Sequence, residues 1–235
     1  SSLIQKQTDN TRYYIPLQFW FNKNPGLALP LIAIAHHKVE IKIKLRSLDS
    51  LIVTNGSGVS TSGNIQEIQL FIDYIYLDAD ERRRFAQTEH EYLFEQIQYN
   101  VGTVANGQNS KYLIFNHPVK EIIWALRNTR RGSKSSTPEL NLHRSYVNGN
   151  DWFNYSSAEK NTTLNLGTYD QFSKARITMD GVERFEKRDA IYFRQVQPYQ
   201  HHSKIPEKEV YSYSFCLNPE EHQPSGTCNF SRIKT

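Results

Sequence analysis

The sequence has little cysteine, and this excludes several classes of protein. Cys216 and Cys228 are the only cysteines among 235 residues, too few for a disulfide-rich secreted domain. Their spacing is not that of a zinc motif either. We expect two free thiols in neighbouring strands, which fits a reducing compartment.

Long apolar segments are absent as well. The longest, residues 27–35, spans nine residues and is interrupted by Pro30, whereas a membrane helix needs about 20. No positively charged leader precedes an apolar stretch, so we expect no secretory signal. The sequence predicts no membrane span.

The motifs of common cofactor and metal sites are missing. Residues 56–63 are rich in glycine and serine, but no helical pattern and no Lys-Ser/Thr pair follow them, so they do not predict a phosphate-binding loop. Histidines occur in adjacent pairs, which is not the spacing of a cupin metal site, two histidines one residue apart followed by a glutamate and a distant histidine. His36 and His37 would also point to opposite faces of a strand, so they cannot hold one ion. These pairs, each followed by a glutamate, are His36–His37 with Glu40 and His201–His202 with Glu207. We predict no metal and no cofactor.

Catalytic groups are equally hard to find. Glu139, Glu159 and Asp170 lie only in predicted loops, where carboxylates are usually solvated. A glycosidase would need two carboxylates about 5–9.5 Å apart, and nothing in the sequence favours such a pair. We expect the His117 ring to bond to backbone beside Pro118, with no nucleophile nearby. We therefore predict no catalytic residue and no enzymatic activity.

The charge balance gives no sign of a polyanionic partner. The net charge is only +4. The basic runs 82–84 and 130–131 lack interleaved aromatic residues. We interpret them as solvated loops or subunit contacts, and we expect no direct binding of nucleic acid.

Aromatic residues and alternating patterns are abundant, and both favour sheets. The chain has 14 Tyr and 12 Phe, which pack well on pleated surfaces. Residues 39–45 alternate apolar with polar side chains, as in a strand with one buried face. The strand-like aromatic run 15–21 is broken by turn residues at 22–26. Within it, Phe19, Trp20 and Phe21 are expected in a core or subunit contact rather than on a ligand platform.

Further strands are predicted along the chain. In residues 65–77 both the odd-numbered and the even-numbered positions carry apolar side chains, as in a strand covered on both faces. Strands are also expected at 90–99, 110–128, 210–217 and from 228 onward. Pro118 must lie at a bend or edge because it lacks a ladder donor. We expect Ile122, Trp124 and Leu126 to share one face, Tyr211, Tyr213 and Phe215 to share another, and Asp180-Gly181 to form a tight turn.

Helical patterns are scarce. Residues 78–88 are charged and compatible with one or two helical turns, and residues 189–200 predict a short helix before Pro198. The periodicity fades over 129–173, which predicts long loops. At least eight short strands with little helix predict an all-β sandwich or barrel, jelly rolls included.

Six segments, in order along the chain, resemble the major capsid proteins of nucleocytoplasmic large DNA viruses. They are PLQFWFNKNPGLALPLIAIAHHKVEI, DYIYLDADERRRFAQTEHEYLFEQIQ, FNHPVKEIIWALRN, ITMDGVERF, YFRQVQPYQ and YSFCLNPEEHQPSGTCNFSRI. The resemblance is weakest in the loops 47–64 and 129–173. The residues that carry the motifs in a structural role are Pro16, Phe19, Trp20, Phe21, Pro25, Gly26, His117, Pro118, Gly181, Pro224 and Gly226.

The resemblance implies a tandem, or double, jelly roll whose homotrimers form pseudo-hexagonal tiles of an icosahedral shell. Its implied partners are itself, neighbouring trimers and minor capsid proteins, and its place is the virion, assembled in the host cytoplasm. An internal membrane beneath such a shell is compatible with this picture. Relative to the family pattern, residues 1–78 would be the closing strands of the first jelly roll, 79–89 a linker, and 90–235 the second jelly roll without its last strand. We therefore expect a portion of a longer subunit.

Two other functions remain open on the sequence. A carbohydrate-binding β-sandwich would use the aromatic residues Tyr146, Trp152, Phe153 and Tyr155, and a metal-dependent jelly-roll enzyme would need a histidine spacing that the chain lacks. Asn-X-Ser/Thr sequons occur at four positions. Of these, Asn55, Asn154 and Asn161 are candidate glycosylation sites, whereas Asn229 is expected in a strand and unmodified.

Overall fold

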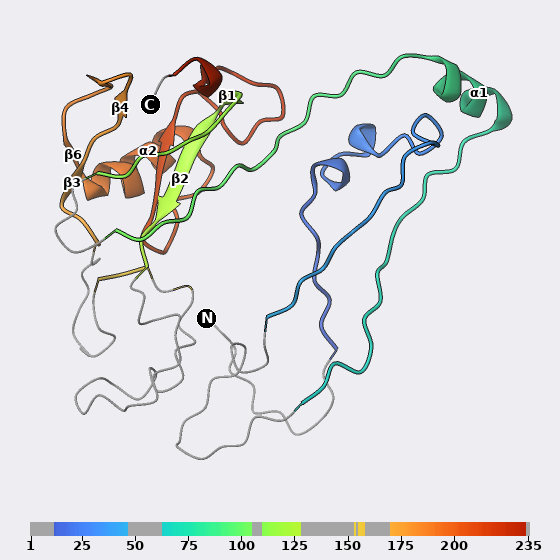
Figure 1. The fold of residues 1–235 in the computed structure, drawn as a ribbon, viewed down its shortest axis with the longest axis horizontal. Helices are drawn as coiled ribbons and strands as arrows, with labels where there is room; N and C mark the ends of the chain where they lie inside the picture. The colour runs from blue at the N-terminus through green and yellow to red at the C-terminus, as the bar shows by residue number, and fades with distance from the viewer. Residues whose placement is uncertain are drawn as a thin grey trace. The chain divides into compact units, whose positions relative to one another are not determined.

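The computed structural model describes residues 12–46, 63–104, 110–127, 153, 155–157 and 170–233. It divides into two compact units. Unit 1 comprises residues 1–41 and 71–97, and unit 2 comprises residues 42–70 and 98–235. The elements of both are drawn in Figure 1, and each unit is treated by itself below.

Unit 1 begins with two short 3₁₀ helices, Trp20–Asn22 and Pro25–Leu27. The predicted turn is confirmed: the Asn24 side chain accepts a hydrogen bond of 2.9 Å from the Gly26 amide and caps the second helix. Trp20 stacks on Phe94 with 4.7 Å between ring centroids, and Phe19 stacks on Phe21 at 5.0 Å. The aromatic run thus packs inside unit 1, as a 3₁₀ turn at its end rather than as a continuous strand.

The charged segment of unit 1 folds as helix α1, Ala79–Gln87, which confirms the predicted helical turns. Asp78 caps it: its Oδ1 accepts a 2.8 Å hydrogen bond from the Glu81 amide. Asp80 and Glu81 lie in the first turn, where negative charge suits the positive end of the helix dipole. The arginines of the run 82–84 are exposed on this helix.

The predictions of strands at 39–45, 65–77 and 90–99 are wrong for the described structure. These segments are extended but carry no ladder pairing, and they run as plain traces in Figure 1. Residues 65–77, expected to be covered on both faces, have exposed apolar side chains, with Phe71 at 76% and Tyr76 at 90%. A strand needs a neighbouring strand that pairs with its amides and carbonyls, and no ladder is formed by these segments within the part of the chain that the structure describes.

Unit 2 contains four antiparallel strand pairs among its described residues. They are β1 (Pro118–Val119) with β8 (Cys228–Asn229), β2 (Glu121–Ala125) with β7 (Val210–Ser214), β3 (Lys174–Ala175) with β6 (Arg188–Asp189), and β4 (Thr178–Met179) with β5 (Val182–Glu183). The pair β2–β7 is the longest, in a register that sets Trp124 opposite Tyr211. Pro118 opens β1 directly after a bend, as predicted from its missing donor.

The tight turn predicted at Asp180-Gly181 is confirmed. Both residues have positive φ, 51° and 78°, and they connect β4 to β5. Positive φ at both central positions is the signature of the hairpin turn that matches strand twist, and asparagine, aspartate and glycine adopt it most easily. The sequence thus determined this hairpin locally.

A continuous helical segment, residues 190–201, packs against β7. It contains a π-helix, Tyr192–Val196, followed by α2, Gln197–His201. The predicted helix over residues 189–200 is confirmed, but the prediction that it ends before Pro198 is wrong. Pro198 lies in the first turn of α2, where a missing amide hydrogen is tolerated, so the chain continues helical to His201.

The core of unit 2 lies between the helical segment and the β2–β7 pair. Ala190, Phe193 and Tyr211 are at most 3% exposed. The predicted face of β2 is confirmed: Ile122, Trp124 and Leu126 are buried or half-buried, whereas Ile123 between them is 56% exposed. On β7 burial does not separate the predicted face, because Ser212 is buried like Tyr211. The described elements are mostly strand pairs with few helices, in agreement with an all-β class.

Candidate functional site

The most highly ordered cluster of side chains is an aromatic core on the β2–β7 pair. Trp124 meets Phe193 edge-on at 5.2 Å and stacks over Tyr211 at 5.9 Å. Phe172 and Phe185 close the cluster, with Phe172 4.6 Å from the Tyr211 ring. Such ring pairs each contribute about 0.5–1.5 kcal/mol beyond the area that they bury. The cluster holds three separate stretches of chain together.

A buried polar network, Asp170–Arg194–Tyr211, lies beside this core. Asp170 Oδ1 accepts hydrogen bonds from Arg194 Nε at 3.0 Å and from the Tyr211 hydroxyl at 2.9 Å. The side chains of Arg194 and Asp170 are only 5% and 15% exposed. Burial, followed by the hydrogen bond to Asp170, raises the pKa of Tyr211 well above its usual value, so the hydroxyl stays protonated.

The network corrects the prediction that Asp170 is a solvated loop carboxylate. Its partner Arg194 lies 24 positions away, on the helical segment. Only the fold brings the two together, so no local pattern of residues could predict the pair. A carboxylate engaged by an arginine and a tyrosine stabilises the fold and is not an available base.

Gln197 forms a second buried link between the helical segment and β7. Its Nε2 donates to the Tyr192 hydroxyl at 2.9 Å, and its Oε1 accepts from the Ser214 amide at 3.0 Å. The side chain, 4% exposed overall, thereby satisfies the last amide of β7. Sequence reasoning missed this residue because glutamine carries no positional signal.

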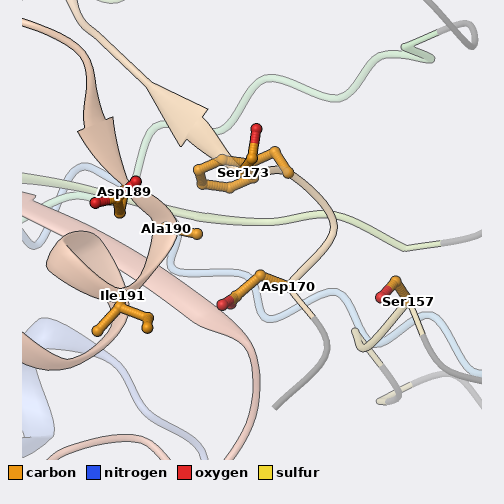
Figure 2. A pocket seen from close by; sticks show the side chains of 7 residues that line it. Ser157, Asp170, Ser173, Asp189, Ala190 and Ile191 are labelled. Atoms are coloured by element: carbon orange, nitrogen blue, oxygen red, sulfur yellow. The ribbon is translucent and has the colours of Figure 1, made fainter. Parts of the chain in front are cut away.

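An open cavity of about 420 Å³ borders the network. Figure 2 shows the side chains around it, with Ala190 and Ile191 coming from the start of the helical segment. Asp170 is engaged as described, and Asp189 lies 3.8 Å from Lys174 across β3–β6. The lining residues are Ser157, Asp170, Phe172, Ser173, Asp189, Ala190 and Ile191. No histidine or cysteine lines the cavity, and the described residues contain no group of three or more metal-ligating side chains.

The motif residues His117 and Gly226 occupy conformationally demanding positions. His117 has φ 69°, and its amide donates to Ser231 Oγ at 2.7 Å while its carbonyl accepts from the Phe230 amide. The expected ring-to-backbone bond is not among the contacts of the described residues; the backbone makes the contacts instead. Gly226 has φ 149°, and a Cβ there would lie 3.3 Å from the Phe215 carbonyl oxygen, so only glycine fits well.

The remaining residues singled out from the sequence lie outside the aromatic core and the buried network. Cys216 and Cys228 are free, as predicted. His36 and His37 are exposed in unit 1, and Asn229 lies in β8 with its Oδ1 accepting from the Ser231 amide. The ring of Phe153 lies under Lys208 Nζ at 5.2 Å. Several predicted residues lie outside the described ones: Asn55, Asn154, Asn161, Glu139, Glu159, Tyr146, Trp152 and the run 130–131.

No described helix has the length and apolar character to cross a bilayer. The remaining motif positions, Pro16, Pro25, Gly26 and Pro224, are exposed. The arrangement as a whole is one of rings and hydrogen bonds that join distant segments. These contacts stabilise the fold; we call the aromatic core together with the buried polar network the packing site.

Two family models cover almost the whole chain. Residues 81–235 match the family described as large eukaryotic DNA virus major capsid protein, and residues 3–78 match the major capsid protein N-terminus. The chain belongs to this family of viral structural proteins.

Individual relatives agree with that assignment. The chain is 41% identical to the major capsid protein of Pyramimonas orientalis virus and 39% identical to that of Paramecium bursaria Chlorella virus 1, covering 94% of this chain in both cases. It spans 51% and 52% of those relatives, so about half of their length. Among solved structures, the PBCV-1 virus capsid matches with a TM-score of 0.66 and 35% identity, over 95% of this chain and 56% of the other.

Proposed function

We propose that this chain is part of a major capsid subunit that builds the icosahedral shell of a large DNA virus. The observation that carries the proposal is the structural match to a virus capsid over 95% of the chain at 35% identity. The packing site supports it, because the buried polar groups of unit 2 bond to one another and hold the fold. A structural role, without catalysis, follows.

In the finer form of the proposal, the subunit is a double jelly roll that acts as a homotrimer. Residues 1–78 would close the first jelly roll, 79–89 would link, and 90–235 would form the second without its last strand. Two family models that meet between residues 78 and 81 support this division. The extended segments have exposed apolar side chains, such as Ile97 at 93%. This exposure supports the jelly-roll form of the subunit, because such segments need partner strands.

The proposed partners are a second and third copy of the subunit, neighbouring trimers and minor capsid proteins. A trimer of double jelly rolls presents six sandwiches, so three chains give a nearly six-sided tile that packs a flat facet. The proposed location is the virion, with assembly in the host cytoplasm. Glycans at Asn55, Asn154 and Asn161 remain part of the proposal.

The carbohydrate-binding alternative is not favoured. All the relatives reported above are named as capsid proteins. Of the aromatic residues proposed for a sugar platform, Phe153 is 69% exposed and its ring pairs with Lys208 Nζ at 5.2 Å, so exposure alone does not decide against a platform.

Sedimentation of the purified subunit tests the proposal. We expect a trimer at micromolar concentration, with a dissociation that depends on protein concentration. A subunit that is folded but only monomeric over the micromolar range would overturn it. Phe193→Ala, which removes a fully buried ring and destabilises unit 2, serves as the control for whether assembly requires the intact packing site.

A further inference from the structure

A second polar cluster in unit 2 lies apart from the buried network and centres on His202. This residue ends helix α2: its amide donates to the Pro198 carbonyl at 2.8 Å. Its ring nitrogens face two carboxylates, with Nε2 3.0 Å from Glu121 Oε2 and Nδ1 3.4 Å from Glu220 Oε1. The His202 side chain is only 14% exposed.

The two carboxylates come from separate parts of the fold. Glu121 is the first residue of β2, and Glu220 belongs to the 215–222 loop that follows β7. Ser203 fixes Glu220, since its amide and its hydroxyl donate to the two carboxylate oxygens at 3.1 and 3.3 Å. The ring therefore stands where three elements converge: the end of α2, the start of β2 and the loop.

The protonation state of an imidazole decides to how many carboxylates it can donate a hydrogen bond. A neutral ring has one N–H donor and one lone pair, whereas a protonated ring donates from both nitrogens. Nε2 and Glu121 Oε2 lie at ion-pair distance, but their geometry is not that of a hydrogen bond. This contact therefore depends on charge: a protonated ring attracts the carboxylate, whereas a neutral ring does not. A positive charge at the end of a helix is also favourable. Imidazole changes charge between about pH 5 and 8.

We infer that His202 is a proton-dependent clasp, which fastens the 215–222 loop and the start of β2 to the end of α2 when its ring is protonated. The clasp is a regulatory device of the fold and does not depend on the proposed capsid function. Its contribution to stability is present while the ring is protonated and is lost when the ring becomes neutral.

The neighbouring groups do not provide an alternative source for this pH dependence. Hydrogen bonds from the Ser203 hydroxyl and amide lower the pKa of Glu220, and His202 adds to the effect, so this carboxylate stays ionised where imidazole titrates. His201 Nδ1 lies 2.8 Å from the Leu217 carbonyl, which a ring N–H can bond in either charge state. The other charged or titratable groups on the three elements are Lys120, Glu121, Tyr199, Lys204, Cys216, Glu221 and His222.

Calorimetric melting of the purified subunit from pH 6 to pH 8.5 tests the inference. We expect the melting temperature of wild type to fall by about 2–4 °C relative to His202→Gln over this range. His222→Gln, the same substitution at an exposed histidine of the same loop, should follow wild type. Parallel curves for wild type and His202→Gln would overturn the clasp.

A second variant keeps the inference falsifiable if His202→Gln fails to fold. Glu220 is 49% exposed, so Glu220→Gln should be tolerated. It removes one of the two carboxylates and should reduce the pH-dependent fall to about half. An unchanged pH dependence in Glu220→Gln would overturn the inference by itself.

Discussion

The extended segments 39–45 and 65–77 and the β2–β7 pair contain the same kind of sequence and fold to different degrees. Residues 65–77 and 39–45 are at least as β-like in composition as β2 and β7, yet of these four segments only β2 and β7 form a hydrogen-bonded ladder. The helical segment 190–201 packs against β7, whereas the apolar side chains of residues 65–77 are exposed. Alternation of apolar and polar residues therefore predicts a face, but a strand also requires a neighbouring strand.

The largest expected effect in that comparison comes from the aromatic core. Phe193→Ala should lower the free energy of unfolding by about 3–5 kcal/mol, because Phe193 is fully buried against Trp124 and Phe185. Urea unfolding measures the loss. Trp20→Ala is the matched change in unit 1, where the ring is only partly buried, and it should cost clearly less. Equal losses would contradict the contrast between the units.

The buried network should be the next most sensitive feature. Asp170→Ala leaves the Arg194 guanidinium buried without its carboxylate, which should cost about 3 kcal/mol. Asp189→Ala is the control, since its pair with Lys174 is exposed and should be worth about 0–1 kcal/mol. Urea unfolding of the two variants side by side separates a buried from a solvated carboxylate. A loss below 1 kcal/mol for Asp170→Ala would be incompatible with the network.

Tyr211 gives this network a pH dependence at the alkaline end. Because burial and Asp170 raise the pKa of Tyr211, the folded protein holds the phenol proton more tightly than the unfolded chain does. The resulting stability is present below about pH 10, the ordinary value for tyrosine, and is lost above it. Tyr211→Phe should lower the free energy of unfolding by about 1–2 kcal/mol at pH 8. From pH 9 to 11, the free energy of unfolding should fall less steeply with pH in this variant than in wild type. Identical alkaline slopes would refute the assignment.

The hairpin turn tests a purely local contribution. Gly181→Ala should destabilise by about 1 kcal/mol, because φ is 78° while no atom lies within 4 Å of the added methyl group. Gly26→Ala, at a glycine without such a conformation, should be closer to neutral. Thermal melting of both variants compares them. A Gly26 variant that is the more damaging of the two would show that backbone conformation is not the cause.

The smallest expected effect lies in unit 1, at the cap of α1. Asp78→Ala removes the acceptor of the Glu81 amide and should cost about 1 kcal/mol of helix stability. Hydrogen exchange of the 79–87 amides measures it locally. Asp80→Ala is the control within the first turn, with a smaller loss of a few tenths of a kcal/mol from the helix dipole.

The parts of the fold that the sequence could predict are those with local causes. The residues Asp180-Gly181 favour the turn in which they lie. Asp78 favours the start of helix α1, and the alternation at 122–126 predicts which face of β2 is buried. The network of Asp170, Arg194 and Tyr211 could not be predicted, because its members are 24 and 41 positions apart. The extended segments were predicted as strands from their composition alone, and this failed because a strand also depends on its tertiary surroundings. The stop predicted at Pro198 failed for a local reason, since proline is tolerated in the first turn of α2.

The hydrogen bond from the His117 amide to Ser231 Oγ joins positions 114 residues apart. During synthesis at about 5–20 residues per second, His117 would therefore wait roughly 6–23 s for its partner to leave the ribosome. Ile122 and Trp124 of β2 wait almost as long for β7, with their apolar side chains unmatched. During this interval the exposed apolar side chains of β2 could aggregate, so we expect chaperones to bind the nascent chain.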